Sequence, residues 1–432
     1  MESFEIFVLV ISFLFFVALG VPIAYSIGLA GVATMLLSID YLPAVATFSQ
    51  RMATGLNSFT LLAIPLFILA GQLMNNGGIA RRLVEFAKVL VGRLPGGLAI
   101  VNVLANMLFG AISGSAGAAA SAIGSIMHPR MKAEGYNENF SAAVNISSAT
   151  TGLVIPPSNI LIVYSLASGG VSIAALFVAG YLPGLLMGFS IMLFAGIHAY
   201  RHNYPLGDKV GLAEGFRKFL DALPSLLLLV IVLGGIIAGI FTATEASGVA
   251  VLYCLVLAFI YGEISWSDLP EIMIKTSLTT AIVLLLVATS LGLSWIMAYQ
   301  EIPQSVSAAL LSLSDNPIVI LLIINMILLF VGVFMDMTPA VLIFTPIFLP
   351  IVTTQLGVDP VHFGIILIVN LCVGLCTPPV GTVLFIGCSV ANVKIESVVR
   401  PLIPFFLAMI VALLLITYVP AISLWLPSVF GL

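Results

Sequence analysis

The chain has 432 residues, of which 61% are hydrophobic and only 7% are charged, and its mean hydropathy is +1.24. Many apolar runs reach about 18 residues or more, which identifies a polytopic membrane protein and excludes a water-soluble one. The net charge of −4 offers no basic surface for nucleic acid, so membrane lipid is the expected surrounding and no nucleic-acid partner is predicted.

The N-terminal quarter predicts membrane helices and one surface arm. The first apolar run, residues 4–19, follows Glu2 and Glu5 instead of a basic region, so we expect a retained transmembrane helix and no signal peptide. Residues 20–22 should separate it from the next helix. The stretch 41–58 mixes polar with apolar residues and is predicted to lie along the membrane surface, as is the matching stretch 266–277.

Basic residues flank the apolar run 98–127 on both sides. Clusters at 81–93 and 130–132 place both of its ends in the cytoplasm by the positive-inside rule, as does a third cluster at 201–218 for a later loop. A segment whose ends share one side does not cross, so we predict a re-entrant hairpin. Its glycines, such as Gly110, suit close helix packing, and Ser113 and Ser115 mark its tip.

The second half of the chain repeats the first. The segment Gly152-Leu-Val-Ile-Pro-Pro157 returns as Gly374-Leu-Cys-Thr-Pro-Pro379, 222 positions later. Two consecutive prolines remove backbone donors and break a helix, which lipid tolerates only where protein or water satisfies the freed groups. Two broken helices in corresponding positions indicate a transporter.

The same displacement predicts a second hairpin at 318–351, with Asp336 and Thr338 at its tip. Five crossings and one hairpin per half would invert the second half relative to the first and leave both termini outside. The predicted fold is therefore an all-α polytopic membrane protein of two inverted-topology repeats, each with a re-entrant hairpin and a broken helix.

Inverted symmetry would bring four polar islands together at mid-membrane: Ser113 and Ser115, Ser158 and Asn159, Asp336 and Thr338, and Thr377 and Thr382. Carbonyl and hydroxyl oxygens at a helix break can replace the water shell of Na⁺, and the positive N-terminal end of a half-helix suits an anion. Prolines should free the carbonyls of Gly152 and Ile155 in one half and of Gly374 and Thr377 in the other.

Two acidic residues need separate explanations. Asp336 lies in an otherwise uncharged apolar stretch, where a carboxylate costs about 2.5–3.5 kcal/mol, so it needs a bound cation or a wet position near an interface. Glu245 follows Thr242 at capping-box spacing, which predicts a helix cap. The four cysteines all lie in apolar segments and are predicted to pack, and no metal site is assigned to the histidines.

The absence of several motifs narrows the function. The sequence has no phosphate-binding Gly-x-x-x-x-Gly-Lys loop, and no His-Glu-x-x-His. Residues 113–117 lack the first glycine of a Gly-x-Ser-x-Gly elbow. We therefore predict that the chain neither hydrolyses ATP nor acts as an enzyme.

Residues 113–117, residues 242–245 and the two Gly-Leu-x-x-Pro-Pro segments resemble the large membrane subunit of tripartite ATP-independent periplasmic (TRAP) transporters, the DctM/SiaM family, over essentially the whole chain. The resemblance implies a Na⁺-coupled importer of organic anions in the bacterial inner membrane that works as an elevator. It also implies two partners, a small four-helix membrane subunit and a periplasmic substrate-binding protein.

Matching the family's sites residue by residue gives two sets. The Na⁺ ligands would be Ser113, Ser115, Gly152 and Ile155 in one half, and Asp336, Thr338, Gly374 and Thr377 in the other. The substrate would contact Ser115, Ser158, Asn159, Asp336 and Thr382.

The resemblance also divides the chain. The expected parts are 1–96 (scaffold and arm), 97–170 (transport domain, first hairpin and broken helix), 171–316 (scaffold and basic connection), 317–392 (transport domain, second hairpin and broken helix) and 393–432 (C-terminal scaffold helix).

The substrate is the least constrained feature. No arginine lies among the proposed site residues, which favours a sugar acid such as sialic acid. The alternatives are import of C4-dicarboxylates or other organic acids, and a stand-alone Na⁺/dicarboxylate symporter. An ion channel would need neither an inverted repeat nor a buried carboxylate.

Overall fold

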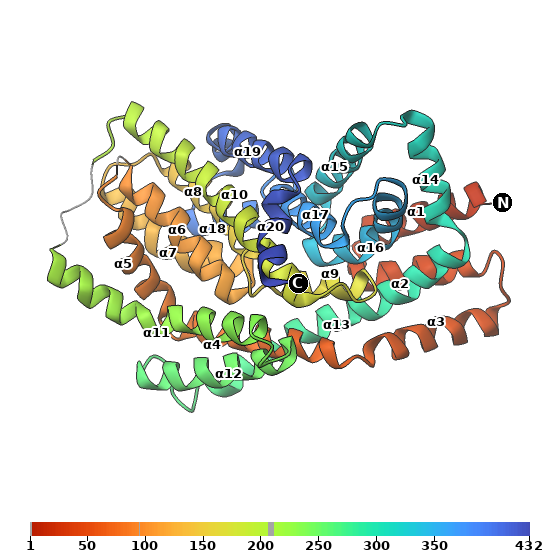
Figure 1. Cartoon of the computed structure of the whole chain (residues 1–432), viewed down its shortest axis with the longest axis horizontal. Helices are drawn as coiled ribbons and strands as arrows, with labels where there is room; N and C mark the ends of the chain where they lie inside the picture. Colours follow the sequence, from red (N-terminus) through yellow and green to blue (C-terminus); the bar gives the residue numbers. More distant parts are fainter. Residues whose placement is uncertain (1, 95, 206–210) are drawn as a thin grey trace.

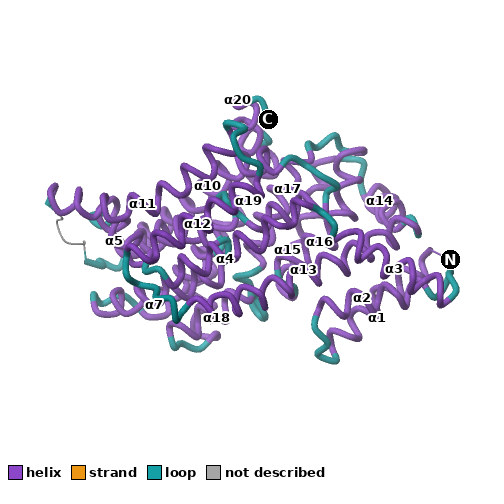
Figure 2. Tube along the Cα trace, turned by 90° about the horizontal axis from the view of Figure 1, so that it is seen from below, coloured by secondary structure: helices purple, strands orange, loops and turns teal. Residues whose placement is uncertain are grey.

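A computed structural model describes residues 2–94, 96–205 and 211–432 of the chain. Within these ranges the structure consists of helices joined by short loops, with no strand (Figure 2). Eight helices in the described part of the chain are long and apolar enough to cross a membrane. The all-α polytopic fold class is therefore confirmed.

The first half contains α1 (Glu2–Ala18), α2 (Ile23–Met35), α3 (Tyr41–Leu56), the 3₁₀ turn η1 (Phe59–Leu62), α4 (Ala63–Asn76), α5 (Ile79–Val91), α6 (Gly97–Ser113), α7 (Ala116–Ala133), α8 (Glu138–Ala149), η2 (Thr151–Leu153), α9 (Asn159–Ala167) and α10 (Ile173–Arg201). The second half contains α11 (Leu212–Ile237), α12 (Ala243–Ile260), α13 (Leu269–Tyr299), α14 (Ile302–Leu313), α15 (Pro317–Phe334), α16 (Met337–Pro350), the π-helix η3 (Ile351–Gln355), α17 (Pro360–Gly374), α18 (Thr382–Ala391), α19 (Ile395–Tyr418) and α20 (Ala421–Phe430).

The repeat that the sequence predicts is visible in the helix order. The hairpin α6–α7 corresponds to α15–α16, and the broken helix α8–α9 corresponds to α17–α18. The helices on either side pair in the same way, α1 and α2 with α11 and α12, and α10 with α19. The predicted break at residues 20–22 falls between α1 and α2, and in the second half the corresponding interruption lies between the end of α11 at Ile237 and the start of α12 at Ala243.

The two halves differ in the predicted surface arms. In the first half α3 is a separate helix, because the chain leaves helical geometry at Asn57, with ψ of 59°. In the second half Thr279 and Thr280 occupy the corresponding positions and stay helical, so the long helix α13 contains most of the predicted arm 266–277. The second arm is thus not a separate element.

The C-terminal segment differs from the single helix predicted for 393–432. Helix α19 ends at Tyr418, the chain turns at Val419 and Pro420, and the short helix α20 follows. Proline has no backbone N–H with which to continue the helix, which explains the turn at this position.

The helices pack in two groups. Helices α1–α4 and α11–α13 contact one another, and α3, α4, α11, α12 and α13 follow one long side of the molecule (Figure 1). The hairpins and broken helices form the other group. Helices α10 and α19 pack against each other and against α8 and α17 of that second group.

Each hairpin crosses its broken helix at a pair of glycines. A Cβ atom on Gly152 would lie 2.4 Å from the Cα of Gly110, and one on Gly374 would lie 2.7 Å from the Cα of Gly332. The two pairs are related by the repeat. The predicted packing role of Gly110 is confirmed, because only residues without a side chain let these backbones approach so closely.

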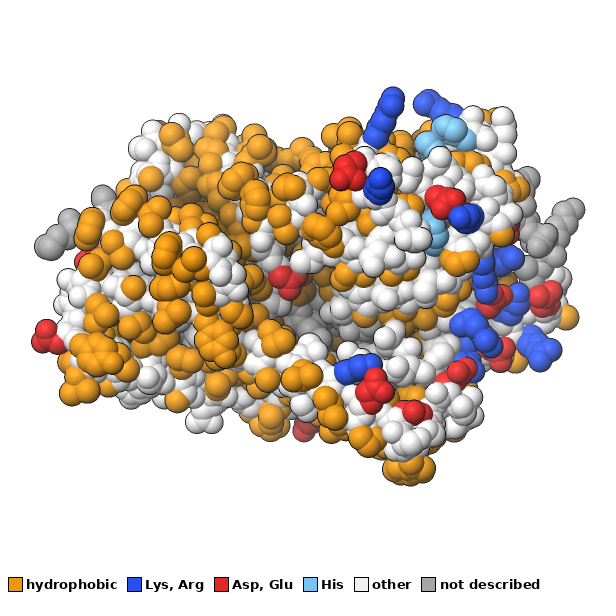
Figure 3. Space-filling view, turned by 180° about the vertical axis from the view of Figure 1, so that it is seen from behind, with side chains coloured by type: hydrophobic (Ala, Val, Ile, Leu, Met, Phe, Trp, Pro, Cys, Tyr) orange, Lys and Arg blue, Asp and Glu red, His pale blue; other side chains and the backbone are white. Residues whose placement is uncertain are grey.

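Lys and Arg side chains gather at one end of the molecule, while apolar side chains cover much of the rest (Figure 3), and ion pairs connect described residues of the three basic clusters. Glu85 on α5 joins them: its carboxylate accepts from Arg130 of α7 at 2.6 Å and from Lys218 of α11 at 3.1 Å. Lys209, in the third cluster, lies outside the described residues. The shared location is what the positive-inside interpretation requires.

Two local predictions are also confirmed. The Oε2 atom of Glu245 accepts from the backbone N–H of Thr242 at 2.8 Å, and the Oγ1 atom of Thr242 accepts from the backbone of Glu245, which completes a capping box at the start of α12. All four cysteines are buried and free, at 3% exposure or less: Cys254, Cys372, Cys376 and Cys388.

Candidate functional site

Each hairpin tip is a two-residue turn whose geometry follows from its sequence. Helix α6 ends at Ser113, and Gly114 adopts a left-handed conformation with φ of +62°. The Oγ atom of Ser115 then caps α7 by accepting the N–H of Ala118 at 3.2 Å. In the second hairpin, Met335 and Asp336 form the turn before α16.

Each broken helix is interrupted at its diproline. Helix α8 ends at Ala149 and the next α-helix, α9, begins at Asn159, while α17 ends at Gly374 and α18 begins at Thr382. Both breaks contain a cis peptide bond between the two prolines. Residues that flank the two diprolines line the same cavity as both hairpin turns: Leu153, Asn159, Leu375 and Thr382.

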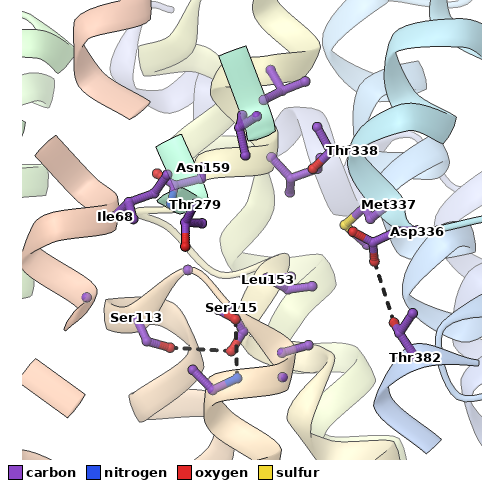
Figure 4. A pocket seen from close by; sticks show the side chains of 18 of the residues that line it. Ile68, Ser113, Ser115, Leu153, Asn159, Thr279, Asp336, Met337, Thr338 and Thr382 are labelled. Atoms are coloured by element: carbon purple, nitrogen blue, oxygen red, sulfur yellow. Dashed lines mark hydrogen bonds between the residues drawn. The ribbon is translucent and has the colours of Figure 1, made fainter. Parts of the chain in front are cut away.

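A cavity of 340 Å³ lies where the tips and breaks meet. Six of the predicted site residues line it: Ser113, Ser115, Asn159, Asp336, Thr338 and Thr382. Figure 4 shows the two serines of the first hairpin and the Asp336–Thr382 pair of the second half facing the cavity from different sides. The structure thus brings together the polar islands that inverted symmetry predicts.

The other predicted residues lie just behind the wall of the cavity. The residues that do not line it, although the neighbouring Leu153 and Leu375 do, are Gly152, Ile155, Ser158, Gly374 and Thr377. The carbonyl of Gly374 accepts the N–H of Thr377 at 2.9 Å, so the adjacent prolines do not leave that oxygen entirely without a partner.

Two polar atoms at the first break lack hydrogen-bond partners. Ser158 is completely buried and its Oγ atom has none, and the same holds for the Oδ1 atom of the adjacent Asn159. A buried polar atom without a partner is unfavourable. Asn159 lines the cavity, so its Oδ1 atom marks a position where a ligand can supply the missing contact, whereas Ser158 lies behind the lining.

Asp336 dominates the electrostatics of the cavity. Its carboxylate is exposed to the cavity, and the Oγ1 atom of Thr382 approaches its Oδ1 atom at 3.5 Å (Figure 4). Among the described residues that line the cavity it is the one ionisable group, and the remaining polar groups are hydroxyls and amides. A carboxylate in such a setting favours a bound cation.

Three polar residues of the cavity wall come from outside the hairpins and breaks and were not predicted. Gln72 and Asn75 belong to α4, and Thr279 belongs to α13. Helix α4 passes directly over the first tip, since a Cβ atom on Gly71 would lie 2.7 Å from the carbonyl oxygen of Ser113. The spacing of Gln72 and Asn75, three apart in an apolar helix, places them on one face and was a usable signal.

Comparison with known proteins identifies the family to which the chain belongs. Residues 10–422 match the DctM component of tripartite ATP-independent periplasmic transporters. The chain belongs to the DctM family. As a member, it is a multi-pass protein of the bacterial inner membrane and a transport subunit rather than an enzyme. The family name also implies assembly with a small membrane subunit and a periplasmic binding protein.

Individual relatives of this DctM protein cover nearly its whole length. It is 56% identical to the protein YgiK of Salmonella typhimurium, over 99% of this chain and 98% of that one. It is 40% identical to the C4-dicarboxylate large permease DctM of Pseudomonas aeruginosa (94% and 95% covered) and 36% identical to the sialic acid large permease SiaM of Vibrio cholerae (95% and 96% covered).

A solved structure shares the fold of this DctM protein. The crystal structure of the YdaH transporter of Alcanivorax borkumensis superposes with a TM-score of 0.66, covering 92% of this chain and 90% of that chain at 15% identity. At this identity the likeness concerns the fold alone.

Proposed function

We propose that this DctM subunit couples Na⁺ entry to the import of a carboxylate-bearing sugar acid, with sialic acid as the first candidate. The observation that carries the proposal is a cavity between two helix breaks whose one ionisable lining residue, among those described, is Asp336. An organic anion entering this cavity is repelled by that carboxylate, so its binding requires cations that enter with it.

One Na⁺ ion bound in each half of the protein would provide the positive charge that the anion needs. In the first half, Ser113, Ser115 and the carbonyls of Gly152 and Ile155 would hold the ion. In the second half, the ligands would be Asp336, Thr338, Gly374 and Thr377. Ions bound there join a hairpin tip to its broken helix and complete the substrate site, and by linkage the substrate raises Na⁺ affinity by the same factor.

The substrate would lie among Ser115, Ser158, Asn159, Asp336 and Thr382. The unpartnered oxygens at Ser158 and Asn159 suit the hydroxyl groups of a sugar acid. A C4-dicarboxylate would bring a second negative charge into a cavity whose described lining contains no Lys, Arg or His. Dicarboxylates remain the alternative, because the relative of Pseudomonas aeruginosa is named for them.

Transport would follow an elevator mechanism. The hairpins and broken helices form a block whose glycine crossings tie hairpin to broken helix in each half. We expect this block to move as a unit past the helices α1–α4 and α11–α13, carrying the cavity from one side of the membrane to the other.

Uptake into proteoliposomes tests this function. Vesicles would hold this chain and its small subunit, and labelled sialic acid would be offered with and without an inward Na⁺ gradient and the soluble binding protein. Saturable uptake that needs both is expected. Uptake without the binding protein would instead support a stand-alone symporter, non-saturating ion flux would support a channel, and uptake of labelled succinate alone would support dicarboxylate import.

The same vesicles test Asp336. The variant Asp336→Asn should fold but require much more Na⁺ for half-maximal uptake, because the cavity loses its charge. The matched control is Asp315→Asn, an exposed carboxylate between α14 and α15, which should transport normally. Wild-type Na⁺ dependence in Asp336→Asn would remove Asp336 from the coupling mechanism.

A further inference from the structure

One polar wall of the central cavity comes from helices outside the block of hairpins and broken helices. Helix α4 contributes Gln72 and Asn75 to this wall, and α13 contributes Thr279. These three residues are called the scaffold wall below. All other polar residues of the described lining belong to the hairpins and broken helices, so the cavity lies at the boundary between the two helix groups.

The scaffold wall lies across the cavity from the Asp336 carboxylate. Figure 4 shows Thr279 and Ile68, which precedes Gln72 by one turn of α4, on the side of the cavity opposite Asp336. Asn159, the third amide of the described lining, lies on that side as well (Figure 4). An anion that Asp336 repels is therefore directed toward a group of neutral amide donors.

Both side-chain amides of α4 are available to a ligand. Gln72 is half-buried and Asn75 is exposed at the cavity, and neither side chain makes a hydrogen bond to another described residue. Their spacing of three places them on one helix face. Thr279, in contrast, donates its hydroxyl proton to the carbonyl of Lys275 at 3.0 Å. The two amides thus supply the free N–H groups of the scaffold wall, and a carboxylate is the acceptor that such donors bind best.

The scaffold wall lies near the cytoplasmic ends of its two helices. Asn75 is the penultimate residue of α4 and precedes the basic cluster at 81–93 by six positions. Arg82 of that cluster pairs at 3.8 Å with Glu263, in the loop before α13, and Thr279 follows the start of α13 by about 15 Å of helix. By the positive-inside rule, the cavity therefore lies toward the cytoplasm in this structure.

The repeat indicates that this wall belongs to one access state. A displacement of 222 positions relates Gln72 to Ser294 and Asn75 to Met297, both on α13. Ser294 and Met297 line a separate cavity of 570 Å³, beside α14 and the end of α16 that is far from the hairpin tip. In an inverted repeat the opposite access state exchanges such contacts, so a hydroxyl and a thioether would then replace the two amides at the central cavity.

We propose that Gln72 and Asn75 are specificity-determining residues of the cytoplasm-facing state, in which their amide groups donate hydrogen bonds to the carboxylate of the bound acid. The contact is lost when the block carries the cavity away from the cytoplasmic ends of α4 and α13. This inference rests on the proposed elevator movement of an organic anion. Neutral donors hold a carboxylate more weakly than an arginine does, which suits the side on which the substrate is released.

Trans-inhibition in proteoliposomes tests the two amides. Labelled sialic acid would be supplied by the binding protein outside vesicles that are preloaded with rising concentrations of unlabelled acid. The external binding protein selects molecules whose periplasmic face is outward, so the preload that halves the initial rate reports the affinity of the cytoplasm-facing state. Gln72→Leu and Asn75→Leu remove the amide at similar size, and each should raise that preload about tenfold.

The external concentration for half-maximal uptake supplies the second readout. It should change by less than about twofold in both variants, because the amides leave the cavity in the outward-facing state. The matched control is Asn76→Leu, which changes an exposed neighbour outside the described lining of the cavity and should alter neither concentration. An unchanged preload in both leucine variants, or an equal rise of the preload and the external concentration, would overturn the proposal.

A second substitution decides the matter if a leucine variant does not fold. Asn75→Asp keeps the shape of the side chain but places a negative charge at the wall, so it should raise the half-inhibiting preload by more than Asn75→Leu does. An unchanged or lower value would refute the contact. Wild-type vesicles that import no sialic acid would instead refute the proposed substrate, and the same series with labelled succinate would then test the scaffold wall.

Discussion

Alanine at Gly152 should destabilise the protein more than alanine at any other glycine of the two helix crossings. The new Cβ atom would lie 2.4 Å from the Cα of Gly110, 2.6 Å from its carbonyl carbon and 2.8 Å from the backbone nitrogen of Ala111. These are backbone atoms of a helix packed on both sides, so neither partner can rotate away. Overpacking of this kind costs about 1–3 kcal/mol, and contact with backbone places Gly152→Ala at the upper end.

Alanine variants at the other crossing glycines should lose less stability, in a graded series. The closest contact is 2.7 Å for Gly374→Ala and 3.1 Å for Gly332→Ala, so the predicted loss falls to about 1 kcal/mol for the latter. Gly248, inside α12, is the matched control, because a Cβ atom there would meet nothing within 4 Å. In an open helical position the change from glycine to alanine should stabilise by about 0.4–1 kcal/mol.

Thermal unfolding of the detergent-purified variants measures their order of stability. We expect the unfolding temperature to fall in the order Gly248→Ala, wild type, Gly332→Ala, Gly374→Ala, Gly152→Ala. If Gly152→Ala unfolds at the temperature of Gly248→Ala, the two backbones are not in contact there, and the close crossing of hairpin and broken helix is wrong.

Three further predictions concern other parts of the molecule. Burial by itself raises the pKa of Glu85. Hydrogen bonds from Arg130 and Lys218 lower the pKa by a larger amount, so it lies below its ordinary value of 4.5. Its stabilisation, about 1 kcal/mol after solvent screening, is therefore present above pH 4.5 and lost as the pH falls through the folded pKa. Glu85→Gln should unfold at a lower temperature at pH 7 and lose that acid dependence, and an unchanged pH profile would contradict this assignment. Ser158→Ala breaks no hydrogen bond, so stability should change by less than about 0.5 kcal/mol while labelled uptake falls, and normal uptake would exclude this residue from the substrate site. Glu245→Gln weakens the cap of α12 and should lower the unfolding temperature slightly with transport intact, whereas loss of transport at normal expression would reveal a functional role.

The repeat and its breaks were predictable because they depend on local chemistry. Consecutive prolines at 156–157 and 378–379 must interrupt a helix wherever they occur, and the spacing of Thr242 and Glu245 fixes a cap within one turn. The six predicted residues that line the cavity could be named for the same reason, since each lies at a turn or a break that the sequence itself specifies.

The remaining features depend on distant segments. Gln72 and Thr279 face the cavity because α4 and α13 pack against the hairpin tips. The spacing of Gln72 and Asn75 shows that they share one helix face, but the segment that this face meets is not specified by any local pattern. The continuity of α13 was missed because polar residues in 266–277 resemble a surface arm, although that helix contains no proline after Pro270 and no glycine before Gly292 to end it. Pro420 was a visible signal for the division between α19 and α20 that the prediction of one helix ignored.

The burial of all four cysteines has a practical consequence for studying movement. Thiol-reactive probes reach sulfur atoms that solvent can reach, and Cys254, Cys372, Cys376 and Cys388 are each enclosed by packed side chains. New cysteines on exposed loops, one on each helix group, can therefore be labelled with spin or fluorescent reporters while the native ones stay in place. Distances between reporters on the two helix groups could then be followed in the otherwise unmodified protein.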